Sequence, residues 1–295
     1  MHWPIIWKPV PKKKIPFFNF HYLQACPQPV DPTIVWGTQV PAQPFTEYSR
    51  ECARRCKALI SPAHVLLQAV GHALQQHPVV NRRVVGRRIH DFRNVNVRMM
   101  TYDRQQNEVD ILLLRDADSL SLKQIARTLW ENQLSVTAGE TTDHEDKALL
   151  RSRLPGPLLG WGVRAFLYLD SKFNLPKLDR IDRTACSPVV VNYLAFAGAP
   201  PMRTYKPSKY PHESSTVSIT MGRTEEVPVV RDGKVETEKV APLFVRADHR
   251  IVSAYELGEF IQTLRTLLAH PAEMDRAVAE QGTDQDQAGA VGEAA

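Results

Sequence analysis

Along residues 243–271 the hydrophobic pattern changes from that of a strand to that of a helix. The first three residues are apolar and favour a strand, and after Ser253 apolar residues recur at three- and four-residue steps, as on one face of a helix. Ser253 is placed to cap this helix, because its hydroxyl can accept a hydrogen bond from the first-turn amides. Between the two elements lies Asp248-His249-Arg250, where a turn can hold a histidine ring at the edge of a cavity. A lone histidine is more often a surface or core residue than a catalytic one, so this pattern alone assigns it no role.

The same patterns predict further elements along the chain. Helices are expected over residues 46–59, 62–76 and 156–170, and another is expected to open after Ser119 or Ser121. Short strands are expected at residues 33–40, 83–85, 95–100, 109–114, 189–194 and 216–221. Residues 227–231 and 234–240 are expected to form a hairpin, because Asp232-Gly233 is a preferred two-residue turn. Helices early and strands late indicate an α/β layered domain with a mixed sheet.

Composition divides the chain into three parts. Residues 1–30 are expected to form an extended N-terminal arm, because the first 16 are rich in proline and lysine. Residues 31–271 are expected to form one folded domain. Residues 272–295 are dominated by Ala, Gly, Gln and acidic residues, which predicts a disordered acidic tail.

Hydropathy predicts a protein without a membrane span. No apolar run reaches the roughly 18 residues that cross a bilayer. The most apolar segment, residues 156–169, is short and contains Arg164, so a buried or interfacial helix is expected there. The N-terminus has no charged stretch before an apolar core, as a signal peptide would have, and we expect a cytoplasmic protein.

The positive charge of the chain lies outside its C-terminal 25 residues, which are acidic. The last 25 residues carry six acidic side chains and one basic, so they contribute −5 to the net charge of +5 and leave +10 on the rest. Such a surface attracts phosphorylated ligands or nucleic acid. The basic residues are scattered and no nucleic-acid-binding motif accompanies them, which favours a phosphate-bearing small molecule over nucleic acid.

Cysteine and histidine spacing predicts no metal site. The four cysteines (Cys26, Cys52, Cys56 and Cys186) form no metal-type pairs and are expected to be reduced thiols. Zinc is not expected either, because the histidines of residues 64–90 have no cysteine or acidic partner at ligand spacing.

Four stretches in order carry a family resemblance. They are residues 61–81, ending in Pro-Val-Val-Asn; residues 114–126, with Arg-Asp-Ala-Asp-Ser-Leu-Ser-Leu; residues 219–233, with Pro-Val-Val-Arg-Asp-Gly; and residues 243–271, with Asp-His-Arg. Together they resemble the catalytic domain of the dihydrolipoyl acyltransferase (E2) component of 2-oxo acid dehydrogenase complexes. The resemblance runs from about residue 30 to 271. It implies a chloramphenicol acetyltransferase-like fold, a mixed β-sheet with flanking helices, and coenzyme A-dependent acyl transfer.

The resemblance assigns candidate catalytic roles. Acyl transfer needs a base that takes a proton from the accepting group and a donor for the oxyanion. His249 occupies the position of the family's base. Asn192 lies where the family has its oxyanion serine, and its amide could donate to an oxyanion or simply bond neighbouring backbone. Ser253 stands where the family has an Asp or Asn that supports the site, and Ala254 replaces the next glycine. Lys12–Lys14 are expected to replace an arginine that pairs with that Asp.

The resemblance also implies partners. Arg82, Arg83, Arg87 and Arg88 are candidates for binding the phosphates of coenzyme A, although a basic hairpin is more often a solvated face. A homotrimer with active sites between subunits is expected, and the polar C-terminal end predicts no assembly beyond it. Nothing in the chain resembles a lipoyl domain, so no covalent lipoyl group is expected on it, and a separate lipoyl or carrier protein is a candidate partner. The alternative is a catalytically degenerate E2-like scaffold or acyl-CoA-binding protein, since the Asp-Gly and Ser positions have changed.

Overall fold

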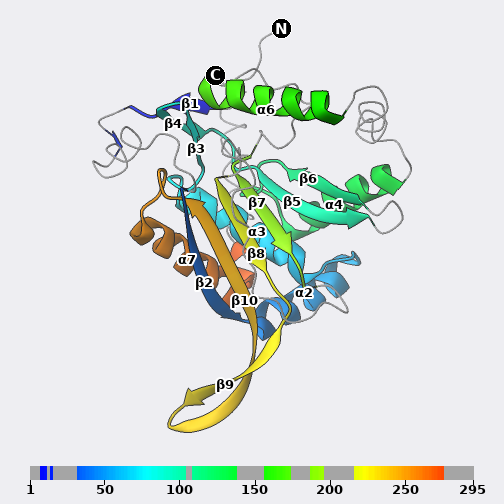
Figure 1. The fold of residues 1–295 in the computed structure, drawn as a ribbon. Helices are drawn as coiled ribbons and strands as arrows, with labels where there is room; N and C mark the ends of the chain where they lie inside the picture. Colours follow the sequence, from blue (N-terminus) through cyan, green and yellow to red (C-terminus); the bar gives the residue numbers. More distant parts are fainter. Residues whose placement is uncertain are drawn as a thin grey trace, which may run out of the picture.

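The computed structural model describes residues 7–11, 14–15, 32–103, 108–137, 156–173, 187–195 and 216–275. Seven described strands form the main sheet, in the order β2-β10-β8-β7-β5-β6 with β9 added to β10 (Figure 1). Their bounds are β2 (Thr33–Pro41), β5 (Val97–Asp103), β6 (Glu108–Leu114), β7 (Val189–Tyr193), β8 (Val217–Met221), β9 (Glu225–Arg231) and β10 (Lys234–Asp248). The β5–β7 and β7–β8 pairs are parallel and the others antiparallel. The predicted mixed sheet is therefore confirmed.

Strand β10 is the longest described strand and joins three others. It pairs with β2 on one side and β8 on the other, and its first half pairs with β9. The sequence predicted two separate strands here, at residues 234–240 and from residue 243. The structure joins them into one strand of 15 residues that ends at Asp248.

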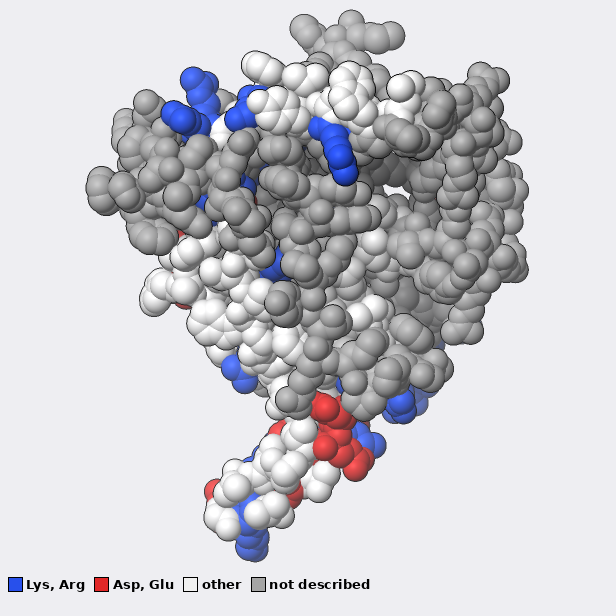
Figure 2. Space-filling view, viewed as in Figure 1, with Lys and Arg blue, Asp and Glu red and all other residues white. Residues whose placement is uncertain are grey.

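The β9–β10 hairpin stands clear of the body at the bottom of the view (Figures 1 and 2). Its turn is Asp232-Gly233, and both residues have positive φ, 49° and 76°. A two-residue turn of this kind matches the twist of the flanking strands, so the predicted hairpin is confirmed. Val230 and Val235 are 72% and 75% exposed beside the turn.

Four helices pack on the main sheet and on one another: α2 (Ala42–Cys56), α3 (Pro62–Gln76), α4 (Leu122–Thr137) and α7 (Ala254–Ala269). Helix α3 contacts the other three, and 11 of its residues are buried, as expected for a helix at the centre of a core. Its bounds are those predicted. Helix α2 begins four residues earlier than predicted, because Pro44 falls in its first turn, where a backbone N–H has no helical partner.

Helix α3 also passes close to the chain before α4. A Cβ atom added to Gly71 would lie 2.5 Å from the carbonyl oxygen of Ala117 and 3.0 Å from the backbone nitrogen of Asp118. Only a glycine at this position lets helix and loop approach so closely.

A smaller sheet lies at the opposite end of the molecule from the hairpin. Its strands are β1 (Trp7–Pro9), β4 (Arg88–Phe92) and β3 (Arg82–Val85), in the order β1-β4-β3. Helix α6 (Gly156–Phe173) contacts β3 and lies across this end (Figure 1). Within the described ranges, no helix has the length and apolarity needed to cross a membrane.

The folded part extends beyond the boundary predicted at Pro271. Residues 272–275 form a helical turn in which Met274 is 1% exposed. The carboxylate of Asp275 accepts a hydrogen bond from the hydroxyl of Tyr48 and another, of 3.1 Å, from the amide of Gln68. Met274 and Asp275 are therefore packed against the folded domain, whereas Ala272 and Glu273 are exposed. Lys12, Lys13, Cys26, Cys186 and residues 276–295, on which other predictions fall, lie outside the described residues.

Candidate active site

His249 lies in the turn between β10 and α7. The backbone of this turn is held on three sides: Asp248 N–H donates to Thr216 (2.9 Å), His249 N–H donates to Pro32 (2.7 Å), and Ile251 N–H donates to Asp248 (3.0 Å). The turn is therefore tied to the chain before β8 and to the chain before β2, and not only to its own two elements.

The side chains on either side of the histidine form an ion pair. The guanidinium of Arg250 donates to the carboxylate of Asp248 over distances of 2.6 to 3.2 Å, and the backbone N–H of Arg250 donates to the same carboxylate (2.9 Å). The two side chains are only 12% and 8% exposed. A bidentate pair of this kind is both strong and directional, so it fixes the turn that presents His249.

The ring of His249 is oriented by the backbone. Its Nδ1 atom lies 2.9 Å from the carbonyl oxygen of Val252. A carbonyl oxygen can only accept, so Nδ1 carries the hydrogen and, in the neutral ring, Nε2 carries the lone pair. Nε2 is thereby the basic atom of a half-buried imidazole.

Ser253 caps helix α7, as its sequence context predicts. Its hydroxyl accepts from the backbone N–H of Glu256 (3.2 Å), while the Glu256 carboxylate accepts from the backbone N–H of Ser253 (2.7 Å). This reciprocal pair is a capping box. The hydroxyl also donates to the same carboxylate (2.9 Å), so Ser253 is engaged with its own helix.

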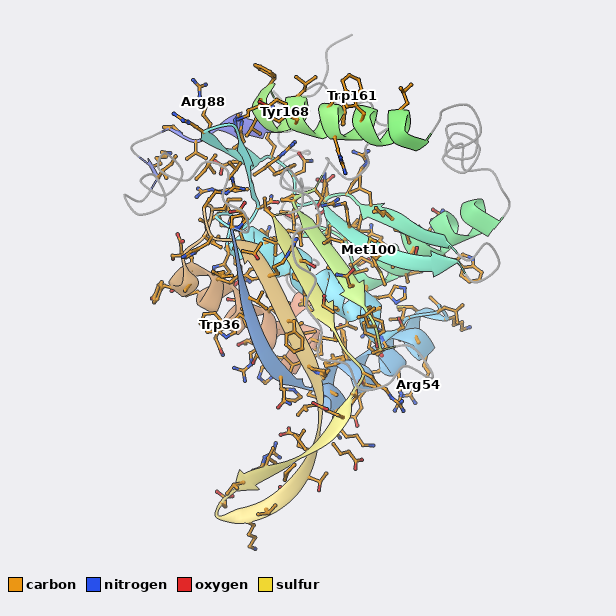
Figure 3. All side chains as sticks on the ribbon, in the orientation of Figure 1. Trp36, Arg54, Arg88, Met100, Trp161 and Tyr168 are labelled. Atoms are coloured by element: carbon orange, nitrogen blue, oxygen red, sulfur yellow. The ribbon has the colours of Figure 1, made fainter. Side chains whose placement is uncertain are left out.

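Asn192 lies on β7, directly opposite Met100 of β5 and Thr220 of β8. Met100 marks this row of the sheet in Figure 3. The side-chain Nδ2 of Asn192 donates to the hydroxyls of Ser218 (3.2 Å) and Thr220 (3.3 Å), which are both buried. Because both hydroxyl oxygens accept from Asn192, the hydroxyl hydrogens of Ser218 and Thr220 are directed away from the Asn192 amide. Sequence reasoning missed these two hydroxyls, because their proximity depends on the register of β7 and β8.

One chain does not bring His249 and Asn192 together. Asn192 is level with Thr220, which is opposite Phe244 of β10. His249 follows five residues after Phe244, which places it roughly 16 Å farther along the sheet at about 3.3 Å per residue. A site that contains both side chains requires a second copy of the chain.

The four candidate arginines lie in different environments on the β3–β4 hairpin. Arg82 donates to Asp91 over 2.7 Å, and Arg83 is only 2% exposed. Arg87 and Arg88, at the turn, are exposed. The predicted role in binding coenzyme A is untested for all four, and only the last two present their side chains to solvent.

A cavity of about 1180 Å³ opens at the base of the β9–β10 hairpin. Tyr193 and Met221 contribute apolar surface to it, and Arg50, Arg223 and Glu226 contribute charge. Neither His249 nor Asn192 lines this cavity, so it is separate from the predicted catalytic residues. In the part of the chain that the structure describes, no group of three His, Cys, Asp or Glu side chains is placed to hold a metal ion. Cys52 and Cys56 are free thiols.

Known proteins share this fold and part of this sequence. The family model described as 2-oxoacid dehydrogenases acyltransferase (catalytic domain) matches residues 212–275. A probable dihydrolipoamide acetyltransferase of Listeria monocytogenes is similar in structure with a TM-score of 0.58 at 15% identity, over 88% of this chain and 94% of that one. No curated protein matches the chain.

Two further structures extend the comparison. The dihydrolipoamide acetyltransferase (E2p) of Azotobacter vinelandii gives a TM-score of 0.58 at 14% identity, over 87% of this chain and 88% of that one. A chloramphenicol acetyltransferase gives 0.51 at 11% identity, over 89% and 99%. The predicted resemblance is thus confirmed: the chain has the fold of the E2 catalytic domains and of chloramphenicol acetyltransferase, and its last three strands, its Asp-His-Arg turn and helix α7 match the acyltransferase family.

Proposed function

We propose that the protein is a coenzyme A-dependent acyltransferase that moves an acyl group between coenzyme A and a thiol, hydroxyl or amine, with His249 as the general base. The observation that carries this proposal is the hydrogen bond from Nδ1 to the Val252 carbonyl, which makes Nε2 the basic atom. Nε2 takes the proton of the accepting group as that group attacks the acyl carbonyl. When the tetrahedral intermediate collapses, the same proton passes to the sulfur of coenzyme A.

The oxyanion of that intermediate needs hydrogen-bond donors. Both hydrogens of the Asn192 amide already point at Ser218 and Thr220. We therefore assign the donor role to this three-residue cluster, in which the hydroxyl hydrogens remain to be directed at a substrate. Asn192 then acts by orienting the two hydroxyls.

The active site would be assembled between copies of the chain in a homotrimer. Two observations support this: the separation of His249 from Asn192 along the sheet, and the projecting β9–β10 hairpin with its exposed valines. An isolated two-stranded hairpin is at best marginally stable in water, and a neighbouring copy would cover it. A separate lipoyl or carrier protein is the proposed natural acceptor.

The direct test is acyl transfer from acetyl-CoA to a panel of thiol, hydroxyl and amine acceptors. His249→Ala should lower turnover roughly 10²- to 10⁴-fold, the usual contribution of a general base. His270→Ala is the matched control, because His270 is exposed at the other end of α7 and should leave turnover unchanged. Equal turnover by wild type and His249→Ala would refute the catalytic role.

Sites between copies can be tested by complementation. Asn192→Ala and His249→Ala would each inactivate every site of their own homotrimer. Mixed trimers would regain some sites in which both residues are intact. Recovery of activity after co-refolding the two variants supports the shared site, and no recovery from trimers shown to be mixed contradicts it.

A non-catalytic scaffold or acyl-CoA-binding protein is the second candidate. It is favoured by Ser253, which is engaged with Glu256. In the Azotobacter enzyme, the residue four positions after the histidine is an asparagine whose role in catalysis was investigated. Calorimetric binding of acetyl-CoA without turnover by the wild-type protein would favour this candidate.

A further inference from the structure

The outer face of helix α6 is apolar although it is exposed. Its large apolar side chains are Leu158 (60% exposed), Trp161 (73%), Tyr168 (49%), Leu169 (42%) and Phe173 (71%). With 3.6 residues per turn they fall in a sector of roughly 140° on one side of the helix. Figure 3 shows Trp161 and Tyr168 along α6 at the top of the molecule. A continuous exposed apolar ridge of this size marks an interaction surface.

Basic side chains border this ridge. Arg164 is exposed on α6, and the ammonium of Lys172 lies 5.6 Å from the centre of the Tyr168 ring. The β3–β4 turn adds the exposed Arg87 and Arg88, and it lies against the C-terminal end of α6. Figure 2 shows lysine and arginine side chains in blue beside white side chains at the top of the view.

Negative charge is gathered elsewhere. Of the exposed side chains that the structure describes on α6 and on the β3–β4 turn, none is acidic. In the view of Figure 2, the main acidic cluster lies at the base of the β9–β10 hairpin, toward the other end of the molecule. The exposed side chains that the structure describes at the α6 end are therefore apolar or basic.

The combination fits an anionic bilayer better than a folded partner. Helix α6 forms a ridge at the outer edge of the molecule (Figure 1), whereas a peptide helix would need a groove. Aromatic and leucine side chains insert at the boundary between headgroups and acyl chains, and lysine and arginine bind the lipid phosphates. Tryptophan and tyrosine are enriched at this depth. We propose that α6 binds the protein to the surface of membranes rich in anionic phospholipid, with the helix lying in the plane of the interface.

Vesicle flotation tests this proposal with the full chain. The wild-type protein should float with vesicles of phosphatidylglycerol and phosphatidylcholine and much less with vesicles of phosphatidylcholine alone. Leu158→Ser combined with Trp161→Ser and Phe173→Ser should weaken binding roughly tenfold or more, because the inserted apolar area is lost. Arg164→Gln with Lys172→Gln should weaken it roughly fivefold for each charge removed.

The hairpin supplies the matched control. Val230→Ser with Val235→Ser removes equally exposed apolar side chains from the other end of the molecule and, in preparations that sediment with the same oligomeric state as the wild type, should leave flotation unchanged. All substituted side chains in the α6 serine variant are exposed, and thermal unfolding at the wild-type temperature would verify its fold.

Three results would overturn the proposal. They are wild-type protein that does not bind anionic vesicles, equal binding by the α6 serine variant, and equal loss in the hairpin variant. A fourth result would give the ridge a different role. If the α6 serine variant sediments as a smaller species than the wild type, and neither protein binds vesicles, the ridge is an interface between copies of the chain. No catalytic residue is changed in these variants, so the outcome is independent of the proposed acyl transfer.

Discussion

The carboxylate of Asp248 and the guanidinium of Arg250 are joined by hydrogen bonds as short as 2.6 Å, on either side of His249. Because both side chains are largely buried, removal of one breaks an ion pair that is shielded from solvent. Asp248→Ala should lower the free energy of unfolding by about 3–5 kcal/mol, measured by urea denaturation. Arg231→Ala is the control, since it breaks an exposed ion pair with Glu238 and should cost less than about 1 kcal/mol. Equal losses would show that the Asp248–Arg250 pair is not a structural element.

The hydrogen bond between His249 and Val252 predicts a single tautomer. Because Nδ1 must donate to the carbonyl, the neutral ring should carry its hydrogen on Nδ1 and not on Nε2. Nitrogen-15 NMR of the labelled protein, with His249→Gln to assign the signal, should show a protonated Nδ1 and an unprotonated Nε2. The opposite pattern, or rapid averaging of the two, would remove the structural basis for Nε2 as the base.

Gly71 and Gly162 form a matched pair of helix glycines. A Cβ atom at Gly71 would meet the backbone of Ala117 at 2.5 Å, and at Gly162 it would meet no other atom within 4 Å. Gly71→Ala should therefore destabilise the fold, because an overpacking cost of about 1–3 kcal/mol or more exceeds the helix-propensity gain of about 1 kcal/mol. Gly162→Ala should be neutral or stabilising. Thermal unfolding measures both, and similar effects at the two sites would contradict the close approach of α3 to Ala117.

Stability should fall as the pH drops below neutrality. Burial lowers the pKa of His64, His72 and His90 from the ordinary value of 6.5. For His64 a backbone bond from Ser61 to Nδ1 also requires an unprotonated atom there. Since these rings hold a proton less readily in the fold than in the unfolded chain, the unfolded state binds more protons below about pH 6.5. Stability is then complete above that pH and is lost progressively below it.

Urea midpoints measured between pH 8 and 5.5 check this expectation. His72→Gln should reduce the pH dependence, while His270→Gln, which changes an exposed residue, should leave it intact. A midpoint that stays constant over this range would contradict the assignment.

Asp275 should contribute to stability although it lies within the predicted tail, residues 272–295. Asp275→Ala removes the acceptor of the Tyr48 hydroxyl bond and leaves the Gln68 amide only its longer bond, of 3.4 Å, to the Leu120 carbonyl, at a cost of about 1–3 kcal/mol. Tyr48→Phe should cost less, and the two changes together should cost less than their sum. A double-mutant cycle in urea measures this coupling, with the exposed Glu273→Ala as control. Strict additivity would mean that Asp275 is not coupled to the core through Tyr48.

The bounds of an element could be predicted where the residues that start and end it lie next to it in the sequence. Helix α3 has a serine cap, a proline at its first position and regular apolar spacing, and the β9–β10 turn has a dipeptide that suits its geometry. The two strands predicted at residues 234–240 and from residue 243 flank Pro242, which cannot donate to a sheet, yet β10 runs through it. In the fold, the Pro242 carbonyl accepts from Gly222, just beyond the end of β8, so its missing N–H faces a place where that strand has stopped.

In the candidate site, too, the parts set by local sequence could be predicted and the parts set by tertiary structure could not. The His249 turn and the Ser253 cap follow from a continuous stretch of sequence. The partners of Asn192 could not be predicted, because Ser218 and Thr220 lie 26 and 28 residues away and meet it only through strand register. Helix α6 has an apolar composition that is typical of burial, and only the tertiary arrangement shows that its outer face is exposed.

Strand β10 runs without a break from a hairpin that stands free of the body to the residue before His249. A load on the hairpin tip would therefore be transmitted along one continuous backbone, stiffened by β2 and β8, and would not be absorbed in a loop. Any partner that binds the hairpin is therefore connected to His249 through the backbone of β10. Docking of a neighbouring copy on the hairpin would then affect the position of the His249 turn through this one strand.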